Sequence, residues 1–193
     1  SLAMRPTLTV REYTNTGVKR EAAGFVKVTW DRGPLRFGAD LNLRHTGFRY
    51  RPSSSADVAP QLIGWTFANP RAGITWTVSP TVSVYATAGR TSREPARGDL
   101  FAGADDLNAG NAAGLLPLDR VRPEQVDDLE GGATWRNARG SVAVNLFDME
   151  FRDEIAAIGA LSLTGSPLRK NVPRSYRRGV ELDGTYQLAR MGT

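Results

Sequence analysis

The chain has 193 residues, of which 40% are hydrophobic and 23% charged, and its formal net charge is +5. Its longest nearly apolar stretch, Ile155 to Leu163, is far shorter than the roughly 20 residues that a membrane-spanning helix needs. The 25 basic residues are interleaved with 20 acidic ones and form no basic stripe, which argues against nucleic-acid binding. One histidine and no cysteine leave too few ligands for a His/Cys metal centre.

Apolar and polar residues alternate with a period of two along several segments, which predicts β-strands with one apolar and one polar face. In the segment 35–49, Leu35, Leu41 and Leu43 share one face, while Asp40 and Arg44 lie on the other. In the segment 141–153 two apolar sets are out of phase, and a bulge near Asn145 would reconcile them. In chain order, we predict eight strands at 4–13, 24–31, 35–49, 70–78, 81–91, 123–135, 141–153 and 173–190.

The connections between these strands alternate between short and long. Residues 31–34, 79–80 and 136–140 are rich in Gly, Pro and Asn, as tight turns require. The long connections are 14–23, 51–69, 92–122 and 154–171. All tight turns then fall at one end of an antiparallel up-and-down sheet and all long loops at the other. This arrangement, with apolar residues facing out and polar residues facing in, predicts an all-β transmembrane β-barrel, present here in part.

From Phe67 onward the sequence also carries five short motifs that resemble, in order, those of one family. They are Asn69-Pro70-Arg71-Ala72-Gly73-Ile74-Thr75-Trp76, Val84-Tyr85-Ala86-Thr87-Ala88-Gly89 followed by Arg93-Glu94-Pro95, Arg122-Pro123-Glu124 with Leu129-Glu130-Gly131-Gly132, Asp153-Glu154-Ile155, and Asn171 with Arg178-Gly179-Val180-Glu181-Leu182. This series resembles the C-terminal half of the barrel of TonB-dependent outer-membrane receptors.

The resemblance implies a receptor in the cell outer membrane that imports scarce nutrients, most often ferric siderophores, and that catalyses no reaction. The family barrel has about 22 strands around a separate N-terminal plug. Residues 1–193 would then be about eight strands of it, with the plug domain, the TonB box and the barrel C-terminus absent. Its partners would be a ferric siderophore or similar nutrient chelate, outer-membrane lipid, and the TonB complex acting through the missing plug. It implies no cofactor.

Three tryptophans, Trp30, Trp76 and Trp135, each lie within three residues of a short turn. We expect them to form an aromatic girdle at one membrane interface. In a soluble β-sandwich, the alternative, they would be unrelated strand-end residues. His45 falls in the lipid-facing register, and we expect it near the outer interface.

Several glycines and carboxylates fall on the polar phase of the strands. We expect Gly38, Gly73, Gly89, Gly132 and Gly179 to leave room for the plug. The spaced pairs Asp128/Glu130, Asp148/Glu150 and Glu181/Asp183 could serve acid-base chemistry, but we interpret them as lumen-facing partners of Arg36, Arg44, Arg71 and Arg177. Asp99, Asp105 and Asp106 lack the ligand spacing of an EF-hand calcium loop.

The loop 92–122 is the predicted ligand-contacting segment, because long loops on a rigid wall commonly carry recognition. Tyr85, Arg90, Arg93 and Arg97 could bind an anionic ferric chelate through charge-assisted hydrogen bonds and ring contact. The alternative for each arginine is a solvated charge or an ion pair with Glu94 or Asp99.

Two other functions remain open from the sequence. A passive porin would have the same barrel without a plug or TonB box. A soluble β-sandwich binding module would fold in water without detergent, whereas a barrel wall would expose apolar strand faces there.

Overall fold

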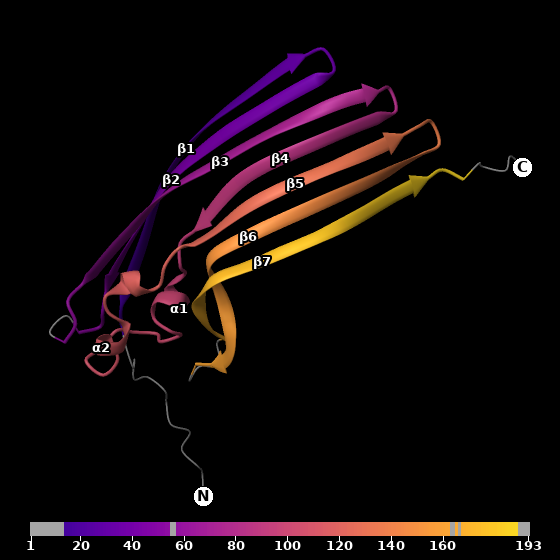
Figure 1. Ribbon diagram of the computed structural model, residues 1–193. Coiled ribbons are helices and arrows are strands. Elements are labelled where there is room, and N and C mark those ends of the chain that lie inside the picture. The colour runs from indigo at the N-terminus through magenta and orange to yellow at the C-terminus, as the bar shows by residue number, and fades with distance from the viewer. Residues whose placement is uncertain (1–13, 55–56, 163–164, 166, 189–193) are drawn as a thin grey trace, which may run out of the picture.

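The computed structural model describes residues 14–54, 57–162, 165 and 167–188 (Figure 1). Seven strands form one antiparallel sheet in the order β1-β2-β3-β4-β5-β6-β7. The strands are β1 (Thr16–Arg32), β2 (Leu35–Arg51), β3 (Gln61–Ser79), β4 (Val82–Arg93), β5 (Glu124–Arg136), β6 (Gly140–Leu161) and β7 (Pro167–Tyr186). Between β4 and β5 lie the short helices α1 (Arg97–Leu100) and α2 (Ala112–Leu115) and the 3-10 helix η1 (Leu118–Arg120).

The predicted antiparallel up-and-down sheet is confirmed, because every strand pairs with its neighbours in sequence. The predicted first strand, 4–13, lies outside the described residues. Tight turns follow β1, β3 and β5, and we call this side of the sheet the tight-turn end; the opposite side is the loop end (Figure 1). No helix in the described ranges is long and apolar enough to span a bilayer.

Three of the four predicted long loops are wrong in extent. Most of the segment 14–23 belongs to β1, and the loop predicted at 51–69 is shortened to the residues between Arg51 and Gln61. The loop predicted at 154–171 is shortened as well, because β6 continues to Leu161 and β7 begins at Pro167. Backbone hydrogen bonding continues there beyond the alternating part of each strand, since a ladder needs no apolar face. Only the loop between β4 and β5, which contains the helices, matches its prediction.

The register assigns each side chain to one of two faces. Tyr85 pairs with Thr75 on β3 and Gly132 on β5, and this row continues to Asn145 and Glu181. We call the face that carries this row the inner face. The adjacent row, on the outer face, contains Leu35, Trp76, Val84, Ala133, Val144 and Leu182.

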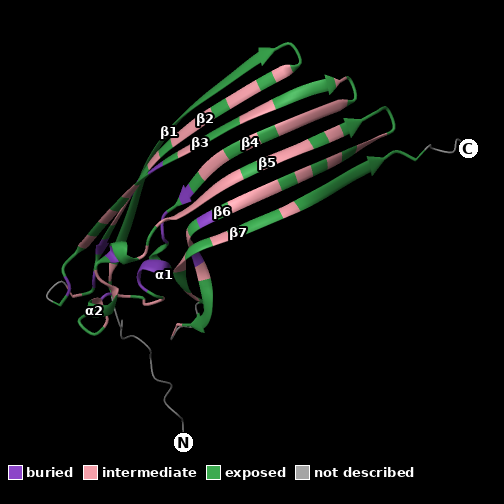
Figure 2. Ribbon diagram, viewed as in Figure 1, coloured by how far each residue is buried: buried purple, intermediate pink, exposed green. Residues whose placement is uncertain are grey.

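The outer-face apolar residues do not form a core. Val180 is 68% exposed and Leu182 75% exposed. Burial is concentrated instead toward the loop end (Figure 2). The sheet is therefore a wall with one apolar face and one polar face, as the alternation predicts.

The predicted bulge near Asn145 is wrong. The register of β6 with β5 and β7 is unbroken from Ser141 to Arg152. Val144 and Phe147 therefore lie on opposite faces. The register of β6 with β7 shifts only later, between Ala157 and Leu161. Before that, Asp153 has a φ of +52°, a left-handed conformation that is uncommon outside glycine.

Inner-face apolar rings on β6 are covered from within the sheet. The guanidinium of Arg177 lies 4.1 Å from the ring centre of Phe151. A Cβ added to Gly179 would lie 2.6 Å from the ring of Phe147. Apolar side chains can thus face inward without a separate core beneath them.

The expected room above the inner-face glycines is largely filled by neighbouring side chains. A Cβ on Gly132 would lie 2.7 Å from the ring of Tyr85, and one on Gly73 would lie 2.8 Å from Thr87. The side chain of Arg71 occupies the space over Gly89. Only at Gly38, among the five glycines named from the sequence, would a Cβ meet no atom within 4 Å.

Candidate functional site

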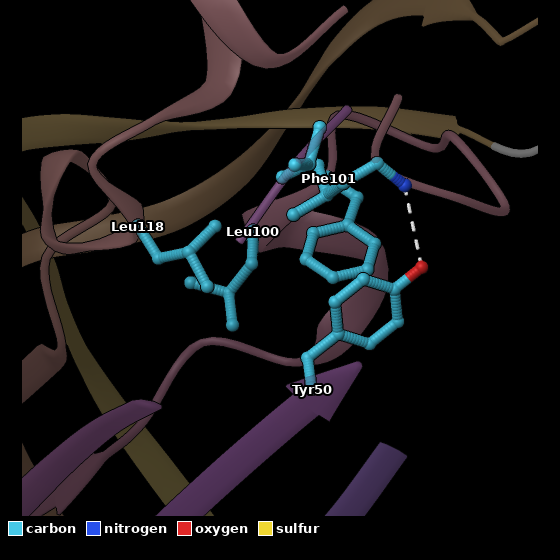
Figure 3. Close-up of a cluster of buried hydrophobic side chains, with 6 residues drawn as sticks. Tyr50, Leu100, Phe101 and Leu118 are labelled. Carbon is cyan, nitrogen blue, oxygen red and sulfur yellow. Dashed lines mark hydrogen bonds between the residues drawn. The ribbon is translucent and has the colours of Figure 1, made fainter. Parts of the chain in front are cut away.

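The loop between β4 and β5 packs against the inner face and forms what we call the loop platform, residues 94–123. Its apolar contacts include Leu100 of α1 and the next residue, Phe101, which pack with Tyr50 of β2 (Figure 3). Val58, Leu107 and Leu118 complete the buried cluster. Near β6 and β7, a Cβ on Gly103 would lie 2.7 Å from Ser162 and 3.1 Å from Leu168. The platform therefore spans the curve of the sheet from β2 to β7.

Tyr50 is the centre of this cluster and is fully buried. Its ring lies edge-on to that of Phe101, with 4.7 Å between the ring centres. The Tyr50 hydroxyl donates to the Asp106 carboxylate and accepts from the Leu107 backbone N–H at 3.2 Å (Figure 3). Burial raises the pKa of Asp106, but hydrogen bonds from Tyr50 and Ser53 outweigh it and lower that pKa overall.

Glu94 holds the start of the platform to the sheet by ion pairs. Its carboxylate lies 2.5 Å from Lys19 Nζ of β1 and 2.7 Å from Arg44 Nη2 of β2. Burial raises the pKa of Glu94, yet the hydrogen bonds from Lys19 and Arg44 outweigh it, so that the pKa lies below its ordinary value. Because the Glu94 side chain is only 8% exposed, these contacts are screened less than surface ion pairs.

Arg97, a predicted ligand residue, begins α1 and is exposed. Its guanidinium donates to Asn15 Oδ1 at 3.2 Å and to the Asp105 carbonyl oxygen. It also lies 5.5 Å from the ring centre of Tyr50 and 5.4 Å from that of Phe101. The guanidinium thus lies over two aromatic rings and is held by neutral oxygens, and it forms no ion pair with a carboxylate of the described residues.

The other three predicted ligand residues lie apart from Arg97. Arg93 pairs with Glu124 at 3.1 Å at the base of the platform. Arg90 donates to Asp127 at 2.6 Å and lies in the outer-face register. The Tyr85 hydroxyl donates to Asn145 Oδ1 at 2.7 Å on the inner face. The structure does not bring the four into one pocket, and ligand binding by them stays a prediction.

The expected pairing of lumen acids is wrong for Arg36, Arg44 and Arg177, whereas the charge of Arg71 does act on one of the named acids, Glu130. Arg36 pairs with Asp31, Arg44 with Glu94 and Glu21, and Arg177 with Glu154. Asp148 and Glu150 lie in the outer-face register, where both contact Arg178. A spacing of two residues places both carboxylates of a pair on one strand face. The strand register decides which face that is and which arginine each carboxylate contacts.

The apolar part of the outer face forms an inclined band. On β7 its boundary toward the loop end is Arg178, whose row runs through Ala88 on β4 to Val28 on β1. On β1 the first polar residue is Arg20, eight residues beyond Val28. At about 3.4 Å per residue and about 4.8 Å between strands, this step corresponds to an inclination of roughly 43°. Strands of transmembrane barrels tilt by about 35–45° from the membrane normal.

Aromatic residues mark the other edge of the band with a similar slope. Trp30, Trp76 and Trp135 lie on β1, β3 and β5, and Tyr186 lies on β7. Each ring after Trp30 lies two residues nearer the tight-turn end than the register row of the ring before it. The three tryptophans are 55%, 47% and 44% exposed. They form the common level that the sequence predicts for an aromatic girdle.

His45 lies at the opposite edge of the band, as predicted. It follows Leu43 in the outer-face register of β2. Its Nδ1 lies 2.9 Å from Thr66 Oγ1 on β3. The imidazole is therefore engaged with a neighbouring strand at the band boundary.

The family model "TonB dependent receptor-like, beta-barrel" matches residues 3–193, which is nearly the whole chain. The chain belongs to the TonB-dependent receptor family. The predicted family is thereby confirmed, and the inclined band is part of a TonB-dependent receptor barrel. No curated protein matches the sequence.

Several solved structures of metal transporters and import receptors share the fold of this chain. The copper transporter OprC superposes with a TM-score of 0.72 at 18% identity, covering 90% of this chain and 27% of that one. The FrpB iron transporter from Neisseria meningitidis gives 0.60 at 17%, covering 92% and 25%. The ferric-catecholate import receptor Fiu from E. coli K12 gives 0.60 at 15%, covering 92% and 27%. The chain thus spans about a quarter of the length of these proteins.

Sequence reasoning missed the residues that fasten the platform to the receptor wall, chiefly Lys19, Tyr50, Glu94 and Phe101. One signal was available: Phe48 and Tyr50 are aromatic residues on the polar phase of β2. An apolar ring on a polar face indicates that something covers it. No local pattern indicated that Phe101 provides the cover, because its contact with Tyr50 joins residues about 50 positions apart.

Proposed function

We propose that this chain is a section of the outer-membrane wall of an active transport receptor that imports ferric siderophores or similar anionic metal chelates. The inclined apolar band carries the proposal, because its slope matches that of strands crossing a bilayer. The family is one of transport receptors, and solved relatives of the same fold include iron and copper transporters. The wall itself performs no covalent chemistry. It satisfies its backbone groups by strand pairing so that a polar face can cross lipid.

The remaining parts of the receptor belong to the same proposal. Residues 1–193 form part of one barrel, a plug encoded elsewhere in the complete protein closes the lumen, and a TonB box on the plug couples it to the energising complex. The loop platform lies at the extracellular end. Arg97 and Arg93 contact the anionic chelate there, and Tyr85 lines the passage beneath. The proposal makes no use of Arg90, which is paired with Asp127 on the outer face.

Uptake of radiolabelled iron tests the proposal. Cells that produce the intact receptor are given ⁵⁵Fe bound to hydroxamate or catecholate siderophores, with and without a functional TonB complex. We expect saturable uptake that disappears without TonB. Uptake that persists without TonB would identify a passive porin instead. Accumulation of copper but of no iron chelate would retain active transport and overturn the siderophore assignment.

A paired substitution tests the role of Arg97. Arg97→Gln removes the unpaired charge and should raise the apparent KM for the ferric chelate severalfold, since a charge-assisted hydrogen bond is lost. Arg120→Gln is the matched control, because Arg120 is an exposed arginine of the same platform whose guanidinium donates to the Gly114 carbonyl oxygen at 3.2 Å. Equal transport by both variants would remove Arg97 from the binding site.

A further inference from the structure

The outer face of β1–β3 carries an unbalanced positive charge just beyond the apolar band. Arg20, Arg49 and Arg51 share the outer-face register on the loop-end side of the boundary. No Asp or Glu occupies the outer-face register anywhere on these three strands. In the described part of the chain, none of the three guanidinium groups forms an ion pair or a side-chain hydrogen bond.

At the same level of the wall, most arginines on the other strands are paired with acidic residues. Asp127 pairs with both Arg90 and Arg152 on the outer face, at 2.6 and 3.1 Å. Arg178 pairs with Asp148 and Glu150, at 2.8 and 3.2 Å. Arg90, Arg152 and Arg178 are therefore balanced within the sheet, whereas Arg20, Arg49 and Arg51 are not; on β7, Arg174, opposite Arg152, likewise has no ion pair within the described residues.

The three arginines surround a hollow in the surface. A groove of about 430 Å³ is lined by Val18, Arg20, His45, Arg49, Arg51 and Leu62. In its middle, Arg20 shares a register row with Gly47 and Gly64, two adjacent residues without side chains. A Cβ built on Gly47 would meet no atom within 4 Å, so the hollow above this row is open.

The groove offers both apolar and cationic contacts. Val18 and Leu62 are 41% and 73% exposed and lie in one row with Arg49 between them. Glu21 also borders the groove, but its carboxylate accepts hydrogen bonds from Arg44 and Thr46 on the inner face. The groove therefore keeps its positive charge.

We infer that this groove binds the phosphorylated headgroup of a lipid in the outer leaflet, with the acyl chains lying on the adjoining apolar band. The inference rests on the proposed function, which places the band in the membrane. A guanidinium group binds two oxygens of one phosphate through two parallel hydrogen bonds, and arginines at the membrane surface attract anionic lipid. The groove lies directly beyond Ala22 and Leu43 at the band edge. A lipid there would place its headgroup against the arginines and its acyl chains against the apolar band.

The test uses the intact receptor in detergent micelles and native mass spectrometry. The probes are diphosphorylated lipid A, dephosphorylated lipid A and inorganic phosphate. The variant Arg20→Gln/Arg49→Gln/Arg51→Gln removes the charge, and Gly47→Leu fills the hollow while leaving the charge intact. Arg152→Gln is the control, because it removes an arginine at the same level that is already paired. Heat-modifiable migration on gels shows which samples contain a folded barrel.

We expect the triple variant to bind diphosphorylated lipid A roughly a hundredfold more weakly, at about fivefold for each arginine. Gly47→Leu should weaken it at least tenfold, while Arg152→Gln should bind as wild type does. Undiminished binding by the triple variant would overturn the inference, as would equal binding of dephosphorylated lipid A. Displacement of lipid A by millimolar inorganic phosphate would show a small-anion site and overturn the lipid assignment. A wild-type protein that never forms a folded barrel would instead refute the proposed function.

Discussion

At the scale of single residues, two inner-face glycines of equal appearance in the sequence have different surroundings. A Cβ on Gly132 would lie 2.5 Å from the Val144 carbonyl oxygen and 2.7 Å from Tyr85, whereas one on Gly38 would meet nothing. The backbone oxygen cannot rotate away as a side chain could. Gly132 is therefore a packing requirement of the wall, and Gly38 is not.

The substitution Gly132→Ala should destabilise the intact receptor by about 1–3 kcal/mol, as overpacking does. Gly38→Ala is its control and should leave stability unchanged or slightly higher, since alanine restricts the unfolded chain. Urea unfolding in lipid vesicles, followed by gel migration, measures both. Equal stability of the two variants would contradict the packing argument.

Glu94 gives the loop platform a pH dependence with a defined sign. Its pKa in the folded protein is lower than its ordinary value of 4.5, so its contribution is complete above about pH 4.5 and is lost as the pH falls through the lower folded value. Amide hydrogen exchange over 94–123, corrected for intrinsic rates, should show protection at pH 6 that declines below pH 4.5.

The variant Glu94→Gln isolates this carboxylate. It should exchange faster than wild type at pH 6 and show little further change on acidification, because the titrating group is gone. Asp119→Asn, an exposed residue of the same platform, should behave as wild type. A wild-type platform equally protected at pH 6 and pH 3 would show that Glu94 does not hold it.

At the scale of elements, the platform depends on one apolar anchor. Phe101 is fully buried and directly follows α1, a helix of four residues that is too short to be stable alone. The cluster around Tyr50 must therefore fix α1 in place. Strand pairing fixes the surface on which it docks.

Replacing Phe101 by alanine should cost the docked platform about 3–5 kcal/mol, the usual range for a buried phenylalanine. Limited proteolysis of the intact receptor should then cleave within 94–123 while the barrel still migrates as folded. Asp119→Ala is the control in the same segment. Protease resistance equal to wild type in the Phe101 variant would mean that the ion pairs of Glu94 suffice.

At the scale of the whole molecule, the two faces of the wall should respond in opposite ways to charge. Val84 lies on the outer face within the apolar band, and its neighbour Ser83 lies on the inner face. An arginine at position 84 would enter the apolar band beside Trp76, close to one membrane interface, at a cost of about 1 kcal/mol, because the cost of about 2–4 kcal/mol at the midplane falls toward the interfaces. At position 83 it would face a polar row that includes Thr77 and Thr134.

We therefore expect Val84→Arg to lower the unfolding free energy of the intact receptor in vesicles by about 1 kcal/mol, and Ser83→Arg to change it little. Insertion yield into preformed vesicles gives a second readout. A larger loss from Ser83→Arg would reverse the assignment of the two faces and with it the membrane placement.

The sequence alone determined the strand type, the antiparallel order and the faces of most strands, because alternation with a period of two is a local property. Leu35, Trp76 and Leu182 could be assigned to one face without knowing any contact. The motifs from Asn69 to Asp183 likewise identified the family, since each is a short local pattern.

The partners across strands and the position of the loop platform became evident from the three-dimensional arrangement. Arg44 pairs with Glu94 rather than with a lumen acid of a neighbouring strand, and Tyr50 meets Phe101 across about 50 residues. The same holds for β6, where register placed Asp148 outward. Such contacts depend on strand register and loop closure, which bring together residues that no local pattern relates.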